Sequence, residues 1–222
     1  YYATVGGGYA NKALGKYSTV PGGSSNTAQG ESSFAAGHYA RAIHDGSFVW
    51  GDRLDAYFES TGNDQFMVRA RGGVYFYTSS GKSAGVYLSA GGSGWNAVSD
   101  RDMKDNIREI DGKDILDRLN CIPISQWSYK TQVPSIEHIG PMAQDFHEAF
   151  GLGEDDKSIN SIDADGVALA AIQGLYEIIQ EKDARIATQQ EQIDAQQKQI
   201  NALESRLAAL EKLVTGAKAD LP

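Results

Sequence analysis

A serine and a lysine lie five residues apart near the middle of the chain, at Ser99 and Lys104. Such a pair can act as a nucleophilic dyad, in which the lysine amine takes the proton of the serine hydroxyl as the oxygen attacks a carbonyl. A lysine in water keeps its proton until about pH 10.4, so the dyad requires burial of the amine or a neighbouring cation. Spacing alone also allows a structural role: Ser99 caps a short helix, Asp102 supports its first turn, and Lys104 lies on a solvated face.

The residues around this pair form a longer motif. The run from Ser99 to Ile107 reads Ser-Asp-Arg-Asp-Met-Lys-Asp-Asn-Ile, and two further motifs follow in order, at residues 138–146 and 166–173. Together they resemble the intramolecular chaperone auto-processing domain found at the C-terminus of phage endosialidases, tail spikes and many bacterial fibre proteins. Pro141-Met142 and Asp145 depart from the family pattern in the second motif, and neither departure touches the dyad.

The resemblance implies a single-turnover self-cleaving serine endopeptidase with Ser99 and Lys104 as its catalytic pair, and with Asp100 and Asn106 as supporting neighbours. Attack of the Ser99 hydroxyl on the Val98 carbonyl passes through a five-membered ring, which favours cutting of the Val98–Ser99 bond in cis. Family members are cut beside the conserved serine. The Ser99–Asp100 bond therefore stays an alternative, above all if another chain supplies the nucleophile.

The charge balance excludes some partners. The chain has 222 residues, with 20 Lys and Arg against 29 Asp and Glu, and a formal net charge of −9. Nucleic-acid binding depends on clustered basic residues, so we expect no nucleic-acid partner. We also expect no membrane insertion, because no stretch approaches 18 apolar residues. Tyr1-Tyr2-Ala3-Thr4 is not a signal peptide and resembles the middle of a longer protein.

Cysteine and histidine usage predicts neither a metal site nor a cofactor. Cys121 is the single cysteine, and no Cys-x-x-Cys or His-x-x-His spacing involves His38, His44, His138 or His147. We expect Cys121 to be a buried small apolar residue. His138 and His147 are candidates for orienting the dyad, but a structural role is expected because a Ser/Lys dyad needs no imidazole.

Residues 1–51 contain a short internal repeat. Gly7, Gly22, Gly37 and Gly51 recur at spacings of 15, 15 and 14. A repeat this short cannot bury a face alone and gains stability by stacking on neighbouring copies, which predicts a β-solenoid. The alternative, a flexible Gly/Ser linker, has no fixed period. The segments 18–23 and 32–37 resemble the β-roll heads of trimeric autotransporter adhesins.

Residues 52–98 have the composition of a strand-rich fibre tip and linker, with β-prone runs at 65–70, 73–78 and 85–88. A similar Phe-x-x-Arg-Ala-x-Gly-Gly-Val segment precedes the chaperone domain in fibre proteins. Exposed aromatic residues here would bind a cell-surface glycan or pack between chains, and packing is the expected role. These residues are Tyr57, Tyr75, Tyr77, Tyr87 and Trp95.

Residues 99–165 predict a small α+β domain, with helices at 112–119 and 142–150 and a strand at 124–130.

Residues 166–216 predict a coiled coil of six heptads, about 70 Å long, followed by a tail at 217–222. Gln189 and Gln196 would form buried polar layers that set the register. We expect a coiled coil of three helices, with a coiled coil of two helices as the alternative. The a positions are Ile172, Ile179, Ile186, Ile193, Ile200, Leu207 and Val214, and the d positions are Leu175, Lys182, Gln189, Gln196, Leu203 and Leu210.

The predicted architecture is a mixed, elongated homotrimer with an N-terminal β-roll, a strand-rich tip, an α+β chaperone domain and a trimeric coiled coil. The predicted function is a C-terminal intramolecular chaperone that trimerises and folds a phage-tail-fibre-like or bacterial surface fibre and then releases itself. The alternative is an adhesive, glycan-binding tip that retains the chaperone as a trimerisation unit. Either function places the chain in a phage virion or on a secreted or cell-surface fibre. No paired carboxylates, metal ligands or phosphate loop support an enzyme for an external substrate.

Overall fold

The structure is a computed structural model that describes the backbone of residues 2–219 and the side chains of residues 2–212. The chain divides into two compact units, residues 1–105 and 106–222. The side chain of Val214, a predicted heptad residue, and tail residues 220–222 lie outside the described part.

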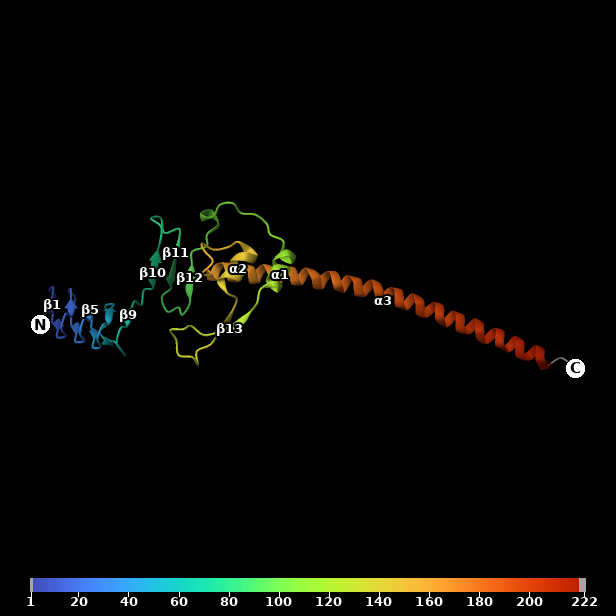
Figure 1. The fold of residues 1–222 in the computed structure, drawn as a ribbon, viewed down its shortest axis with the longest axis horizontal. Helices are drawn as coiled ribbons and strands as arrows, with labels where there is room; N and C mark the ends of the chain where they lie inside the picture. The colour runs from blue at the N-terminus through green and yellow to red at the C-terminus, as the bar shows by residue number, and fades with distance from the viewer. Residues whose placement is uncertain (1, 220–222) are drawn as a thin grey trace. The chain divides into compact units, whose positions relative to one another are not determined.

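The first unit begins with a parallel β-solenoid of about four turns, which confirms the predicted solenoid (Figure 1). Each turn adds one strand to each of two sheets, so strands from successive turns pair in parallel. The first sheet contains β1 (Thr4–Val5), β3 (Thr19–Val20), β5 (Phe34–Gly37), β7 (Phe48–Gly51) and β9 (Phe66–Arg69). The second contains β2 (Lys12–Ala13), β4 (Thr27–Ala28), β6 (Ala40–Ala42) and β8 (Phe58–Glu59).

The interior of the solenoid is thin and filled by small side chains. Its apolar core consists of Val20, Ala28, Ala35, Ala40, Ala42 and Val49, all fully buried. Asn26 is also buried, and its amide donates to the carbonyls of Gly22 and Gly37 while its oxygen accepts from the Ala40 amide. The buried amide is therefore satisfied by backbone groups of adjacent turns.

Glycine recurs in the repeat because one corner of each turn excludes a side chain. Gly8, Gly23 and Gly37 have φ values of 88°, 93° and 91°, a region that favours glycine. A Cβ atom at each would collide with a carbonyl of the next turn. The corner therefore requires glycine at Gly8, Gly23 and Gly37, whereas Gly7 and Gly22 of the predicted repeat lie one residue earlier and have open space at the Cβ position.

The solenoid extends to Arg69, beyond the boundary at residue 51 that the repeat suggested. β8 and β9 continue both sheets, and Phe48 of β7 pairs with Phe66 of β9, a step of 18 residues. The last turn is longer than the 14- and 15-residue turns before it. The sequence period therefore breaks while the hydrogen-bonding pattern continues.

An ion-pair cluster closes this last turn. The Asp52 carboxylate, only 15% exposed, accepts from Arg69 Nε at 3.0 Å and from Arg71 Nε at 2.8 Å. The Arg69 guanidinium also donates to the Ala56 carbonyl at 2.8 Å and lies 5.3 Å from the centre of the Phe58 ring. The Arg71 side chain, with further hydrogen bonds from the Arg71 and Leu54 amides and from Arg69, holds the pKa of Asp52 far below its usual value.

We expect Asp52→Asn to destabilise the solenoid at pH 7 and to have a smaller effect at pH 3. A carboxyl with a lowered folded-state pKa stabilises the fold above its unfolded pKa of about 4 and loses that contribution as the pH falls further. Thermal unfolding by circular dichroism at both pH values measures the difference between variant and wild type. Asp105→Asn, which removes one exposed charge of the same unit, is the control. An equal difference at pH 3 and pH 7 would contradict the role of the Asp52 charge.

A three-stranded antiparallel sheet follows the solenoid (Figure 1). It contains β10 (Val74–Tyr77), β11 (Gly85–Leu88) and β12 (Trp95–Ala97). Two of its strands coincide with the β-prone runs predicted at 73–78 and 85–88. Alternation along β10 places Phe76 on one face with Trp95, at a ring distance of 5.8 Å, and Tyr75 on the other with Tyr87, at 5.5 Å.

The second unit is a small α/β segment that leads into one long helix. It contains the helices α1 (Gly112–Cys121), α2 (Ala143–Phe150) and α3 (Ser161–Ala219) and the hairpin of β13 (Ser125–Trp127) and β14 (His138–Gly140). α2 ends at Gly151, whose φ of 64° gives the left-handed C-cap that the sequence predicted. α3 begins five residues before the predicted start of the coiled coil and continues through residues 217–219 of the predicted tail.

α1 packs on the first turns of α3 through a close backbone contact (Figure 1). A Cβ atom at Gly174 would collide with the Gly112 carbonyl, so the two helices approach more closely there than larger residues would allow. Lys113 Nζ contacts the Glu181 carboxylate at 2.6 Å, and Glu181, followed by the charges of Glu177 and Asp111, raises the pKa of Lys113. Among the side chains of this unit that the structure describes, the buried apolar ones are Ile122, Phe146, Val167, Ala170 and Ala171.

Cys121 is exposed, so the expectation that it is buried was wrong. It is the last residue of α1, and the next residue, Ile122, is the one that is buried. The helix ends at this point with Ile122 in an extended conformation as its C-cap. The change of backbone direction turns Ile122 inward and leaves the thiol at the surface.

Candidate functional site

The candidate site begins where β12 ends. The Val98 amide donates to the Gly85 carbonyl at 3.0 Å, which holds the residue before Ser99 against β11. Gly85 has a φ of 151°, and a Cβ atom there would collide with the Phe76 carbonyl of β10. The Val98–Ser99 peptide bond is therefore attached to the edge of an ordered sheet. The spacing of the motif gives no indication of this contact.

A single turn brings Lys104 back toward Ser99. The turn is the 3₁₀ helix η1 (Arg101–Met103), and its N-cap is Asp100, whose carboxylate accepts from the Asp102 amide at 3.1 Å. The Lys104 amide donates to the Arg101 carbonyl at 3.1 Å, which closes the turn. The cap is thus the residue after the serine rather than Ser99 itself, and the Ser99 hydroxyl is not used for capping.

The turn places the two predicted catalytic side chains in contact. Lys104 Nζ donates to Ser99 Oγ at 2.7 Å, within the range expected of a nucleophile and its base. Both residues are exposed in the protomer. A lysine in water carries a proton at neutral pH, so action as a base requires surroundings that favour the neutral amine.

The other predicted residues differ in position. Asp100 supports the pair through the turn, whereas Asn106 has a left-handed φ of 56° and is the first residue of the second unit. His138 Nε2 contacts Gln132 Oε1 at 2.8 Å, and His147 Nδ1 contacts the Leu152 carbonyl at 2.9 Å. Both imidazoles thus have hydrogen-bond partners of their own within the second unit.

The aromatic side chains considered for glycan binding each contact another ring or a nearby cation, and all are exposed except Tyr87, which is half-buried. Tyr57 lies 5.1 Å from Tyr39 and below the Arg41 guanidinium at 5.0 Å. Tyr75 stacks on Tyr87 and lies 6.2 Å from Tyr77. Glycan binding by this group stays a prediction.

No group of three or more His, Cys, Asp or Glu residues could hold a metal ion within the described part of the chain. The search for helices long and apolar enough to cross a membrane found none among the described residues.

We expect Asp100→Ala to slow self-cleavage and Asp100→Asn to retain most of it. Alanine removes the acceptor that caps η1, whereas the asparagine side-chain oxygen can still accept from the Asp102 amide. Loss of an N-cap costs about 1 kcal/mol, so a decrease in rate of about fivefold is expected if the turn has to form before attack. Cleavage rates followed on denaturing gels measure the effect.

Asp102→Ala is the matched control, because it removes a charge from the same turn without removing the capping oxygen. Equal rates for Asp100→Ala and Asp102→Ala would contradict a capping role for Asp100.

Comparison with known proteins supports the identification of this segment. No curated protein and no solved structure matches the chain. Residues 99–151 match the model of the family Peptidase_S74, described as chaperone of endosialidase. The match begins at Ser99, includes Lys104 and ends at the C-cap of α2. Residues 99–151 are therefore similar to the endosialidase chaperone family, which confirms the resemblance that the motifs predicted.

Proposed function

We propose that the chain is a self-releasing intramolecular chaperone that assembles as a homotrimer, folds a fibre and then cuts itself beside Ser99. The observation that carries the proposal is the 2.7 Å contact between Lys104 Nζ and Ser99 Oγ inside a segment that matches the endosialidase chaperone family. Ser99 is the nucleophile and Lys104 the general base. The chaperone match favours a fibre of a phage virion or of the bacterial surface as the folded product.

The chemistry is an acyl shift followed by hydrolysis. The neutral Lys104 amine takes the Ser99 hydroxyl proton, and Oγ attacks the Val98 carbonyl carbon through a five-membered ring. The carbon–nitrogen bond breaks, the nitrogen takes a proton to become the α-amine of Ser99, and the Val98 acyl group remains on Oγ as an ester. Water then hydrolyses the ester to a Val98 carboxylate and restores the hydroxyl. Cutting of Ser99–Asp100 by a second chain is the alternative.

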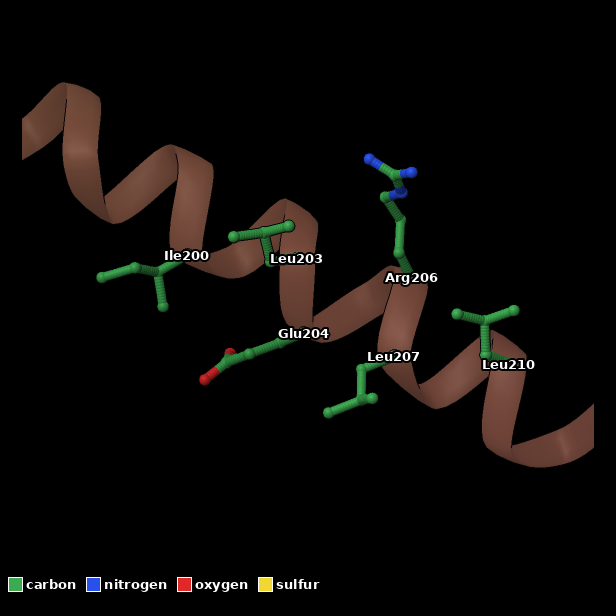
Figure 2. Close-up of a pocket in the computed structure, with 6 residues that line it drawn as sticks. All are labelled: Ile200, Leu203, Glu204, Arg206, Leu207 and Leu210. Carbon is green, nitrogen blue, oxygen red and sulfur yellow. The ribbon is translucent and has the colours of Figure 1, made fainter.

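The two apolar faces of α3 support assembly. One face is covered within the chain and includes Val167, Ala170 and Ala171. The heptad residues from Ile172 to Leu210 lie on a different face and are exposed, among them Ile172 at 63% and Leu175 at 47%, and Figure 2 shows the last of them. An apolar stripe that the protomer leaves uncovered is typical of a helix that packs on other copies. The intrachain packing of α1 thus leaves the coiled-coil seam available.

Assembly through α3 would solve a kinetic problem of the fibre. Pairing of strands across three chains is slow, because loop-closure entropy opposes long-range contacts, and it exposes strand edges that aggregate. A C-terminal coiled coil sets the stoichiometry and aligns the chains first. Release of the chaperone afterwards removes the nucleating element, so unfolding of the fibre becomes kinetically difficult.

A denaturing gel of freshly expressed protein, combined with intact-mass measurement, tests the proposal. We expect the wild type to give two fragments that meet at Val98–Ser99, and Ser99→Ala and Lys104→Ala to give one uncut chain of unchanged oligomeric state. Fragments that meet at Ser99–Asp100 would indicate the alternative bond. Normal cutting in Ser99→Ala would disprove the assignment of the nucleophile.

A further inference from the structure

The strand before the candidate site is the end strand of its sheet. β12 has three residues, all exposed, and follows β11 in the strand order β10-β11-β12 (Figure 1). The Trp95 ring lies 5.8 Å from the Phe76 ring, and Asn96 Nδ2 donates to the Tyr87 carbonyl at 3.3 Å. A strand at the end of a sheet can pair only once its neighbour has become ordered.

The pairing of β12 with β11 continues by one contact beyond the strand. The register opposes Ala97 to Val86, and its continuation opposes Val98 to Gly85. The Val98 amide donates to the Gly85 carbonyl at 3.0 Å, whereas among the described residues no backbone amide donates to the Val98 carbonyl. The ladder therefore holds the nitrogen of Val98 and leaves free the carbonyl that Ser99 attacks in the proposed reaction.

Gly85 is fixed from its other side by β10. It pairs with Tyr77, and a Cβ atom at position 85 would collide with the Phe76 carbonyl. Its φ of 151° lies in a region that favours glycine. The contact between β10 and β11 thus sets the direction of the Gly85 carbonyl. A larger residue at this position would turn that carbonyl away from Val98.

The two parts of the site depend on contacts of different range. Ser99 and Lys104 are five residues apart and meet through the turn η1. Val98 and Gly85 meet only when β12 has paired with β11. Long-range contacts form later than local ones, because loop closure costs entropy. The nucleophile and its base can therefore be in contact before the scissile carbonyl is in place.

We propose that the Gly85 carbonyl is a positioning group for self-cleavage. By holding the Val98 amide, it presents the Val98 carbonyl carbon to Ser99 Oγ, so the chain is cut only after the three-stranded sheet has formed. Orientation of a reacting group can change a rate by orders of magnitude. The proposal rests on the proposed function and adds to it a positioning residue and the folding step that permits the cut.

Two proline substitutions test the contact in the full-length chain. Val98→Pro removes the amide that donates to Gly85. Ala97→Pro removes an amide that faces away from β11, because alternate residues of an end strand face the ladder. We expect self-cleavage of Val98→Pro to be at least about tenfold slower than that of the wild type, and Ala97→Pro to be cut at close to the wild-type rate. Intact-mass measurement of the fragments over time gives both rates.

The pH dependence of cleavage distinguishes positioning from damage to the dyad. The rate of a reaction that uses a general base rises with pH as the base loses its proton. A misplaced carbonyl lowers the rate at every pH and leaves the midpoint of that rise unchanged. A disturbed contact between Ser99 and Lys104 would move the midpoint. We expect Val98→Pro to have the same midpoint as the wild type.

Gly85→Ala tests the same contact from the neighbouring strand and leaves the residues of the scissile bond unchanged. The added methyl group collides with the Phe76 carbonyl. Gly81→Ala, in the loop between β10 and β11, meets open space and is the control. We expect Gly85→Ala to be cut at least about tenfold more slowly than the wild type and Gly81→Ala to be cut normally.

These outcomes are separate from those of the proposed function. Three results would each overturn the positioning role and leave the dyad assignment intact: equal slowing by Val98→Pro and Ala97→Pro, a shifted midpoint in Val98→Pro, or wild-type cutting of Gly85→Ala. Normal cutting in Ser99→Ala, or a wild-type chain that stays uncut, would instead overturn the proposed function and the positioning role with it.

Discussion

Lys104→Arg will strongly slow self-cleavage, although it conserves the positive charge and most of the reach of the side chain. A guanidinium keeps its proton at every relevant pH and cannot accept the Ser99 proton. Arginine can still donate a hydrogen bond to the hydroxyl, as Lys104 does at 2.7 Å. General-base catalysis typically contributes a factor of 10² to 10⁴, so we expect the rate to fall at least about 100-fold.

Lys113→Arg is the matched control for this substitution. Lys113 pairs with Glu181 at 2.6 Å, a contact in which arginine can replace lysine. We expect normal self-cleavage in this variant and an unchanged oligomeric state in both. Quantification of the fragments over time by intact-mass measurement distinguishes a lost base from a misfolded chain. Cutting of Lys104→Arg at the wild-type rate would show that position 104 acts through its charge alone.

Gly174→Ala and Gly166→Ala should change the stability of the second unit in opposite directions. Both glycines lie in α3, and alanine is favoured over glycine in a helix interior by up to about 1 kcal/mol. At Gly166 the added methyl group meets open space, so only the gain is expected. At Gly174 it collides with the Gly112 carbonyl and must move α1. Overpacking of this kind costs about 1–3 kcal/mol.

Thermal unfolding of both variants at one fixed protein concentration measures the difference, because the stability of an oligomer depends on concentration. We expect a higher melting temperature than wild type for Gly166→Ala and a lower one for Gly174→Ala. If both substitutions raised the melting temperature, the close contact of α1 with α3 would not contribute to the packing of this unit.

The local features of the site could be predicted from the sequence because they depend on residues close together in the chain. Ser99 and Lys104 are separated by one turn, and their spacing was enough to suggest contact. The capping role of Asp100 was not predicted, since the spacing had suggested Ser99 as the N-cap and Asp100 only as a neighbour of the dyad. The hydrogen bond from Val98 to Gly85 was not predictable, because it depends on how β12 pairs with β11.

The sequence by itself determined the repeating parts of this protein. Glycines every 14 or 15 residues specify a solenoid because each turn imposes the same steric demand, and apolar residues every seven specify a helix with one exposed stripe. Only the tertiary structure decided where the solenoid ends, which is at a turn of 18 residues closed by Asp52 and Arg69. It also decided which face of α3 is covered by α1. Such contacts join residues whose separation follows no period, so no local pattern in the chain predicts them.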